Sequence, residues 1–393
     1  MKIKNELLKS AIGLIGNVPT NPGFQTSQFV KVTAGAKKLR LALTGVLIAE
    51  ATIPVDVTES WEVVLSRDNL FSFVQAMTAS ADIDITVKKD GDAARVTLSS
   101  KGHKISIASK EELTSAYQQW KAKESEKISI AAFKSEAGLM AQYAPDLDVD
   151  GKWANILFIK KNGIVTTNTK ELVAVMDGKV KATTLIPPQI ARVAADLDAS
   201  EILTDGNGYG VVTDTGYVYQ PKKHALSEYP QEEMQAMMDA GLKAKPSFVL
   251  PASKANDMFT YLRNFASEGA KTKVQLTASK AKGSVIATLR MYSVDGSADR
   301  NIKVDVTSDM SVTIPLMDVL PWFGYMAKVG GDVEFSRLDD PPQFIASLKL
   351  EGKAHLLISA DSSPDAEEKS EAPPFETEEV EAKPKKKVKR KAA

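Results

Sequence analysis

The chain has 393 residues, of which 43% are hydrophobic and 25% charged, with 50 basic residues, 50 acidic residues and no cysteine. Its length predicts roughly two to four domains of about 100 to 200 residues each. The lack of cysteine excludes a disulfide framework, a thiolate zinc site and a thiol nucleophile. No run approaches the roughly 18 to 20 apolar residues that a bilayer helix needs, so we expect a soluble, intracellular protein without a membrane partner.

The three histidines, His103, His224 and His355, are far apart in the sequence. None has the spacing of a metal-ligand pair, and a lone histidine is more often structural or solvated than catalytic. We therefore expect no metal site, no cofactor and no enzyme. An enzyme that used surface carboxylates is the alternative, but the sequence offers no paired, buried constellation for it.

The first third of the chain predicts a helix, strands, a second helix and three more strands. Residues 6–16 carry apolar side chains at i, i+3, i+4 and i+7, which is typical of an amphipathic helix, with Leu8, Ile12 and Ile15 on one side. Residues 61–77 combine a strand-like run, a polar break and a helix. Residues 82–109 then alternate through three short strands joined by Asp-Gly and Lys-Gly turns. We predict a first domain over residues 1–115.

The same order recurs in the middle of the chain, where we predict a second domain over residues 127–228. Residues 131–143 form its first helix. In TTLIPPQIARVAADL, residues 183–197, Ile-Pro-Pro marks a strand-to-helix turn, and Ile190, Val193 and Leu197 point to the core. DGNGYG, residues 205–210, resembles a glycine-rich nucleotide loop, but its place between two strand signals favours a hairpin turn.

A polar connector with a methionine-rich helical stretch leads to a third domain over residues 246–360. Residues 253–266 form its first helix, and residues 332–360 its closing strands. In SVTIPLMDVLPWFGYM, residues 311–326, Pro321 is expected to break or kink the helix. Trp322 and Phe323 are expected in the core, with base stacking as the alternative.

The three segments are therefore copies of one plan. Their second helices begin roughly 120 to 128 residues apart, a period too long for a solenoid. A helix followed by strands occurs twice in each predicted domain and therefore six times in the chain. The predicted fold class is α+β, with helices on one face of antiparallel sheets in three tandem domains.

A tail from residue 361 onward differs from this body in composition. It holds nine acidic and eight basic residues with one aromatic residue, acidic first and basic last, which predicts disorder. Its basic cluster, KPKKKVKRK, has three open interpretations: electrostatic help on DNA or a partner, a nuclear import signal, or a solvated tail.

Three tandem domains of this plan resemble the beta sliding clamp of bacterial DNA polymerase III. The resemblance covers residues 1–360 and is carried by the order, spacing and apolar pattern of ELLKSAIGLIG, SRDNLFSFVQAM, TTNTKELVAV, TLIPPQIARVAADL, IPLMDVLPWFGYM and AHLLIS. It implies a homodimeric ring that encircles duplex DNA and keeps a polymerase on its template, without an active site. The divergence suggests a virus-encoded relative, in the cytoplasm of a bacterium or an infected cell, although the basic cluster leaves a nucleus-like compartment open.

In such a ring the helices line the hole, so their polar faces become candidate DNA contacts. A solvated helix face is the alternative for each residue. The faces are nearly neutral, so we expect weak, sliding contacts with phosphates. The candidates are Lys9, Ser10, Gln75, Lys134, Gln189, Arg192, Lys254 and Arg263.

The resemblance also implies a groove between the second and third domains that binds short peptides of the polymerase and the clamp loader. The family motif Thr-Asp-Gly-His-Arg-Leu corresponds to residues 167–172, where only the first and last residues match. Ordinary core residues are the alternative. The candidate groove residues are Thr167, Leu172, Met237, Leu356, Leu357 and Ile358.

Ring closure in the family pairs an edge strand of the first domain with the start of the third. Ile105, Ile107 and Phe265 occupy the matching places with apolar side chains. Pairing an edge strand across a subunit boundary protects it from aggregation. We therefore predict a DNA-encircling clamp. A clamp-derived interaction scaffold that does not encircle DNA is the alternative, and the neutral helix faces would suit it.

Overall fold

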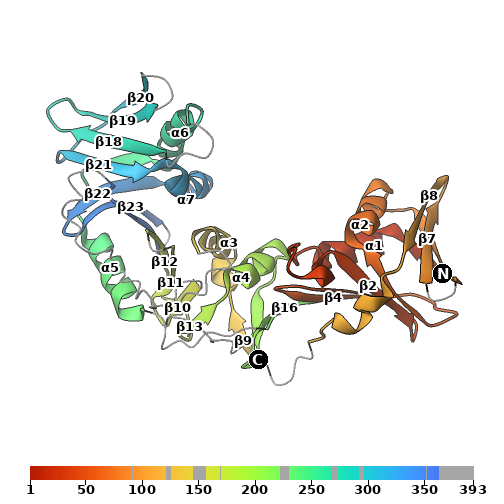
Figure 1. Cartoon of the computed structure of the whole chain (residues 1–393). Helices are drawn as coiled ribbons and strands as arrows, with labels where there is room; N and C mark the ends of the chain where they lie inside the picture. Colours follow the sequence, from red (N-terminus) through yellow and green to blue (C-terminus); the bar gives the residue numbers. More distant parts are fainter. Residues whose placement is uncertain are drawn as a thin grey trace, which may run out of the picture. The chain divides into compact units, whose positions relative to one another are not determined.

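The computed structural model describes residues 1–90, 93–120, 125–144, 156–168, 170–221, 230–266, 272–291, 296–350 and 352–362 (Figure 1). The chain divides into two compact units. The first comprises Met1–Asn168, Val173–Met238 and Leu350–His355, and the second comprises Thr169–Leu172, Asp239–Lys349 and Leu356–Ala393. The first unit takes in both of the first two predicted domains, so the division into three domains remains a proposal.

Antiparallel strands form most of the first unit. The chain's first sheet has the order β1, β6, β7, β8, with bounds β1 (Lys2–Lys4), β6 (Asp82–Asp90), β7 (Ala93–Ser100) and β8 (His103–Ala108). A larger sheet has the order β5, β2, β3, β4, β16, β15, β14, β9. Its strands are β5 (Trp61–Ser66), β2 (Phe29–Gly35), β3 (Lys38–Thr44), β4 (Ile48–Pro54), β16 (Gly216–Gln220), β15 (Tyr209–Val212), β14 (Glu201–Thr204) and β9 (Glu126–Ser129).

A third run of strands in this unit follows the order β13, β10, β11, β12. Its members are β13 (Thr184–Ile186), β10 (Ile156–Ile159), β11 (Gly163–Thr167) and β12 (Glu171–Met176). Successive residues of β10, β11 and β12 are buried, so both faces of these strands are covered. In β2 only alternate residues are buried. The alternating strands therefore have one face on a core and one face towards solvent, as the period-2 pattern predicts.

The pairing of β4 with β16 joins two segments that are far apart in the sequence. Gly216 lies opposite Ala51, and Tyr219 lies opposite Ile48. A Cβ atom on Gly216 would lie 1.9 Å from the carbonyl oxygen of Glu50, so only glycine fits this close approach. The larger sheet is consequently continuous across the junction that we predicted between the first and second domains.

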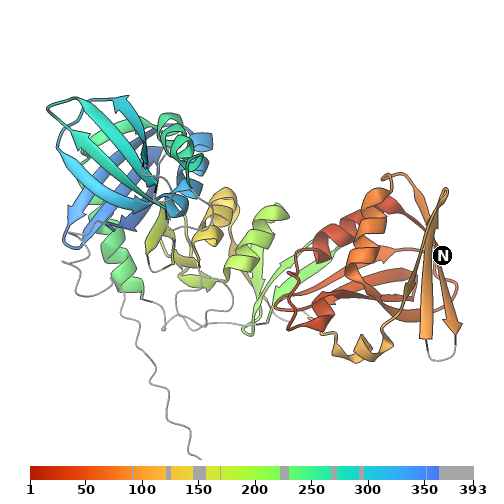
Figure 2. The same ribbon diagram turned by 45° about the horizontal axis from the view of Figure 1, so that its top comes forward.

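Helices in the first unit pack in pairs on one face of the strands (Figures 1 and 2). α1 packs on α2, and α3 packs on α4. Leu8, Ile12 and Ile15 on α1 are buried, as predicted. The side-chain amide of Asn5 donates to the carbonyl oxygens of residues 74, 77 and 78 at 3.0 to 3.1 Å, which ties the start of α1 to the end of α2. The bounds are α1 (Asn5–Ile15), α2 (Arg67–Ala76), α3 (Lys134–Tyr143) and α4 (Pro188–Asp196).

The Ile-Pro-Pro turn starts α4 as expected. Pro188 is the first residue of this helix, where its missing N–H costs nothing and its fixed φ suits the helix. Ile190 and Val193 are buried. Leu197 follows the last helical residue and is half-buried, so it is less buried than the other two residues predicted to point to the core.

DGNGYG forms the hairpin between β14 and β15, with Leu203 opposite Gly210. The Asp205 carboxylate accepts hydrogen bonds from the backbone N–H groups of Asn207 and Gly208, both at 3.0 Å. Its other oxygen accepts the indole N–H of Trp120 at 2.8 Å. The prediction of a hairpin rather than a nucleotide loop is confirmed.

Trp120 lies in the polar connector between the first two predicted domains, residues 1–115 and 127–228. Its ring stacks on Tyr219 with centroids 4.7 Å apart and meets Tyr217 edge-on at 5.4 Å. A Cβ atom on Gly210 would lie 2.5 Å from this indole, so the glycine leaves room for the ring. The connector is therefore held against β15 and β16 by a buried aromatic side chain.

The second unit has two antiparallel runs of strands. One has the order β20, β19, β18, β21 and the other β24, β23, β22, β17. The strands are β17 (Phe248–Pro251), β18 (Lys273–Ser279), β19 (Ser284–Met291), β20 (Gly296–Lys303), β21 (Met310–Pro315), β22 (Asp332–Asp339), β23 (Pro342–Leu350) and β24 (Lys353–Ala360). The helices are α6 (Ala252–Arg263) and α7 (Leu316–Val329), which pack on each other, and α5 (Gln231–Lys243) precedes them in the chain.

Pro321 does not break α7, so of the two outcomes predicted for it, a break or a kink, the break was wrong. The helix runs through it, because buried residues on both sides of the proline, Val319 and Trp322 among them, hold the two halves on the core. Phe323 lies 4.5 Å from Phe259 between ring centroids. Trp322 and Phe323 are fully buried, which confirms their place in the core and excludes base stacking.

The folded body extends two residues beyond its predicted end at residue 360. The Asp361 carboxylate is buried, accepts the backbone N–H of Thr313 at 3.0 Å and lies 3.4 Å from the Arg337 guanidinium. The N–H of Ser362 bonds to the carbonyl oxygen of Thr313. The predicted disordered tail from residue 363 onward, with its basic cluster, lies outside the described residues.

Candidate DNA-facing helices, edge strands and peptide-binding residues

The residues predicted to face DNA all lie on the paired helices, and none of them is buried. Those on the first unit are Lys9 and Ser10 on α1, Gln75 on α2, Lys134 on α3, and Gln189 and Arg192 on α4. Those on the second unit are Lys254 and Arg263 on α6. Ser10, Gln75, Arg192, Lys254 and Arg263 are exposed, and the other three are half-buried.

Acidic side chains on the same helices offset these cations. Glu6, Asp68, Asp196 and Asp257 are exposed on α1, α2, α4 and α6. Lys134 is already engaged, because its ammonium donates to the backbone oxygen and the carboxylate of Asp198 at 2.7 and 2.8 Å. The helix faces are thus near neutral, as expected from the sequence.

Arg67, the first residue of α2, is a cation that does not face solvent. Its guanidinium donates to the carbonyl oxygens of Val18 at 2.7 Å and Gly16 at 3.0 Å. Burial lowers the pKa of this guanidinium. Arg67 therefore fixes the loop that follows α1 instead of contributing to a DNA-facing surface.

Within the described residues, β8 and β20 each lie at one end of a four-stranded sheet and have a neighbouring strand on one side only. β8 ends the sheet that contains β6 and β7, and β20 ends the sheet that contains β18 and β19. Of the predicted interface residues, Ile105 on β8 is half-buried, while the Ile107 side chain is buried within its own unit. Ile107 can therefore offer a partner its backbone but little of its side chain.

Phe265 is 43% exposed just beyond the end of α6. Its ring meets that of Tyr261 at 5.2 Å, and the Arg300 guanidinium of β20 lies 5.4 Å from the centre of the Tyr261 ring. Tyr261 is also exposed. The sequence pointed to Phe265, but it missed Tyr261 and Arg300, because only the tertiary structure brings β20 beside α6.

The residues predicted to line a peptide groove are mostly buried. Thr167, Leu172, Leu356, Leu357 and Ile358 have at most 1% of their surface exposed, and Met237 is half-buried. In the second unit a Cβ atom on Gly241, near the end of α5, would lie 3.1 Å from side-chain atoms of Leu356 and Ile358. The end of α5 therefore packs directly on β24.

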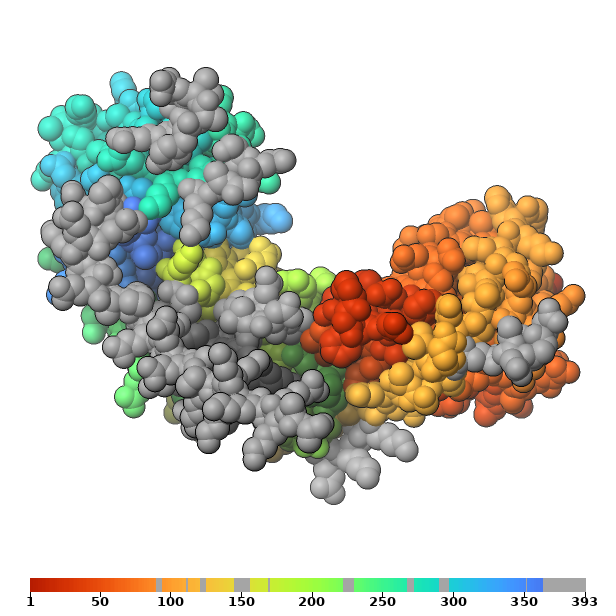
Figure 3. All heavy atoms as spheres, viewed as in Figure 1, coloured from red at the N-terminus to blue at the C-terminus, as the bar shows by residue number. Residues whose placement is uncertain are grey.

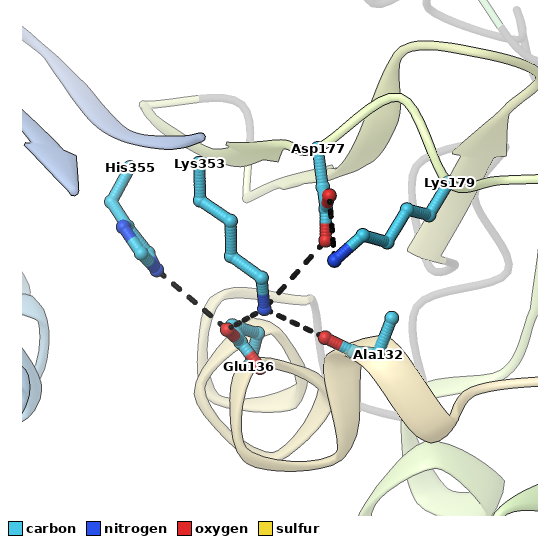
Figure 4. A network of polar contacts seen from close by, with 6 residues as sticks. All are labelled: Ala132, Glu136, Asp177, Lys179, Lys353 and His355. Carbon is cyan, nitrogen blue, oxygen red and sulfur yellow. Dashed lines mark hydrogen bonds and ion pairs between the residues drawn. The ribbon is translucent and has the colours of Figure 1, made fainter. Parts of the chain in front are cut away.

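A network of buried charges surrounds the first residues of β24, which belong to the first unit together with the rest of Leu350–His355 (Figure 4). The Lys353 ammonium donates to the Glu136 carboxylate and to the carbonyl oxygen of Ala132, both at 2.7 Å. It lies 3.8 Å from the Asp177 carboxylate, and His355 Nε2 lies 3.7 Å from Glu136. Burial alone would raise the pKa of Glu136, but the contacts with His355 and Lys353 outweigh it and lower this pKa to about 2.

Sequence inspection does not reveal this network, because its members come from α3, the turn after β12, and β24. Lys353 and Glu136 are 217 residues apart. Among the described residues, no group of three or more His, Cys, Asp or Glu side chains is arranged to hold a metal ion. No helix in the described ranges is long and apolar enough to cross a membrane.

The chain has the fold of the beta sliding clamps of DNA polymerase III, in which paired helices cover one face of antiparallel sheets. A sliding clamp from Pseudomonas aeruginosa, solved with bound griselimycin, matches with a TM-score of 0.69 at 13% identity, over 91% of this chain and 98% of its own. The DNA polymerase sliding clamp of Caulobacter crescentus matches with a TM-score of 0.70 at 11% identity, over 91% and 98%. No family model and no curated protein matches the sequence.

Proposed function

We propose that the chain is a DNA sliding clamp, a homodimeric ring that encircles duplex DNA and tethers a replicative polymerase. The observation that carries this proposal is the match to sliding clamps over 91% of the chain. The role is topological and needs no catalytic group or cofactor. We expect the protein in the cytoplasm of a bacterium or an infected cell, and the low identity suits a virus-encoded clamp.

The chemistry of the helix faces supports a ring that slides. Each phosphate neutralised by a cation contributes about −0.9 to the slope of log affinity against log salt on duplex DNA. Lys9, Arg192, Lys254 and Arg263 share their helices with exposed carboxylates. We therefore expect a shallow salt dependence, and retention on DNA that comes from ring closure.

Ring closure is the second element of the proposal. The open edge of β8 in one copy would pair with the open edge of β20 in another, which removes both exposed edges. Tyr261, Phe265 and Arg300 lie beside β20 and provide an exposed apolar and cationic patch for the contact. Light scattering should report a dimer for the native chain and a monomer for Phe265→Asp.

Short peptides of the polymerase and the clamp loader are the proposed partners of the residues around Leu172, Met237 and Leu356. Leu172 and Leu356 are buried, so a peptide reaches them only by displacing part of the packing around β24, whereas the half-buried Met237 is directly accessible. A Met237→Asp variant should then lose polymerase binding while it keeps its retention on circular DNA.

The absence of cysteine allows a direct test of encirclement. Ser106→Cys on β8 and Asn301→Cys on β20 are both exposed positions, and a bismaleimide would link them without any competing thiol. A ring linked around a nicked circular plasmid should survive detergent and high salt, and should leave once the plasmid is cut. Rings linked before DNA is added are the control and should not be retained.

An interaction scaffold that does not encircle DNA is the second candidate, favoured by the neutral helix faces. The scaffold hypothesis predicts a dimer that the bismaleimide crosslinks efficiently but that is lost from circular and linear DNA alike. That result would reject the clamp proposal while leaving the fold and the dimer intact.

A further inference from the structure

The first unit has a pocket that the proposed clamp function does not use. It lies between β9 and the segment that leads into β13, and its volume is about 350 Å³. This is near the lower end of the roughly 300 to 1,000 Å³ that ligand pockets occupy. Its lining includes Ile128, Phe133, Phe158, Val180, Lys179 and Lys181.

Two open strand edges flank this pocket. Within the described residues, β9 pairs with β14 alone and β13 pairs with β10 alone. Both strands are short, and the residues of β9 are largely exposed. An extended segment can add to such an edge through main-chain hydrogen bonds, while pockets beside it select alternate side chains.

The floor of the pocket is apolar and held in place. The rings of Phe133 and Phe158 meet edge-on with centroids 6.1 Å apart, and both residues are buried. The Lys353 ammonium lies 5.3 Å from the centre of the Phe133 ring, so the charge network of Figure 4 supports this floor. A supported apolar floor of this size suits one aromatic or large aliphatic side chain.

The rim carries three lysines and two glutamates. Lys127 and Glu201 lie 2.8 Å apart and offset each other. Lys179 and Lys181 are exposed on the side that leads to β13, where the Asp177 carboxylate lies 3.5 Å from the Lys179 ammonium and leaves a net charge of one cation. Glu126 is exposed on β9. The cationic side therefore favours carboxylates on an occupant. A nucleic acid fits less well, because its continuous row of phosphates would also meet Glu126 and Glu201.

The geometry points to a docking site for an extended acidic peptide of a partner protein, anchored by one aromatic or large aliphatic side chain in the pocket. The backbone of the peptide would extend the edge of β9 or β13, and its carboxylates would lie against Lys179 and Lys181. This inference stands apart from the clamp proposal, because it does not require a ring or DNA.

The test measures binding of a fluorescein-labelled peptide, Glu-Glu-Thr-Phe-Thr-Glu-Glu, to the full chain by fluorescence anisotropy. The double variant Lys179→Glu/Lys181→Glu should weaken binding by about tenfold, which corresponds to about 1.4 kcal/mol. Ala182→Trp, an exposed lining position, should block the pocket sterically. Lys88→Glu on β6 is the matched exposed control and should stay within about twofold of the native affinity.

Peptides with lysine in place of glutamate, or alanine in place of phenylalanine, should bind at least about tenfold more weakly. Equal binding of the native chain and the pocket variants would overturn the site. Tight competition by an unrelated oligonucleotide would overturn the peptide assignment. Binding that emerges only in Phe375→Ala would also overturn it, because the occupant would then be the acidic segment around Phe375 of this chain itself.

Discussion

The pair of Glu136 and Lys353 offers the sharpest test of the energetics of this fold. The Glu136→Gln substitution keeps the shape of the side chain and removes its charge, which leaves the Lys353 ammonium beside Ala132 without its closest anion. The Lys353 side chain is only 22% exposed, so water replaces the lost partner poorly. The substitution should therefore destabilise the first unit.

The pKa of Glu136 sets the magnitude. A fall of this pKa from its usual value of 4.5 to about 2 corresponds to about 3 kcal/mol of stabilisation at neutral pH, at 1.36 kcal/mol per pKa unit. Removing one partner of a buried ion pair costs about 3 to 5 kcal/mol. We expect Glu136→Gln to lower the free energy of unfolding by about 3 kcal/mol.

Urea denaturation at pH 7, followed by circular dichroism and tryptophan fluorescence, measures this loss. Glu201→Gln is the matched control, because Glu201 and Lys127 are 2.8 Å apart, close to the 2.7 Å of the buried pair, but are 46% and 66% exposed. Exposed ion pairs contribute about 0 to 1 kcal/mol. Equal losses in the two variants would refute the argument that burial decides the strength of the pair.

The pH dependence provides an independent check. The folded-state pKa of Glu136 lies below its unfolded value, so its stabilisation is present above about pH 4.5 and is lost as the pH falls through about 2. The stability difference between the native chain and Glu136→Gln should shrink over this window. A difference that stays constant from pH 7 to about pH 2.5 would contradict the assignment.

Three other substitutions test the packing, each by its urea midpoint. Trp120→Ala removes a buried ring and its bond to Asp205, and should cost about 3 to 5 kcal/mol; a loss below about 1 kcal/mol would mean that the connector is not anchored there. Gly216→Ala should abolish the β4 to β16 pairing, because the new Cβ would lie 1.9 Å from a carbonyl oxygen. Gly13→Ala, where nothing lies within 4 Å, should stabilise α1 by about 0.5 to 1 kcal/mol, and destabilisation would contradict the open space there.

Local patterns predicted the order of the elements well. The apolar period of residues 6–16 and the alternation of residues 82–109 correspond to α1 and to β6, β7 and β8. The hairpin at DGNGYG was also predictable, because Asp and Gly determine the turn through neighbouring backbone groups. In each case the interactions that select the structure lie within a few residues.

Predictions that depended on distant residues were less accurate. Pro321 lies inside a continuous helix because of the core residues around it, and Asp361 is buried because Arg337 and Thr313 lie beside it. Trp120 lies among polar residues in the sequence, but its ring is buried, because Gly210 leaves room for it. Local propensity carries no information about such partners.

In Figure 3 red residues of the first unit lie directly against orange residues, which come later in the sequence. By itself the sequence determined the helices, strands and hairpins, since periodic apolar residues and turn residues act over short distances. Only the tertiary structure decided that Glu136 meets Lys353, that β4 pairs with β16, and that a pocket lies between β9 and β13. The residues that meet there are about 55 to 220 positions apart in the sequence, and their approach depends on the packing of the whole unit.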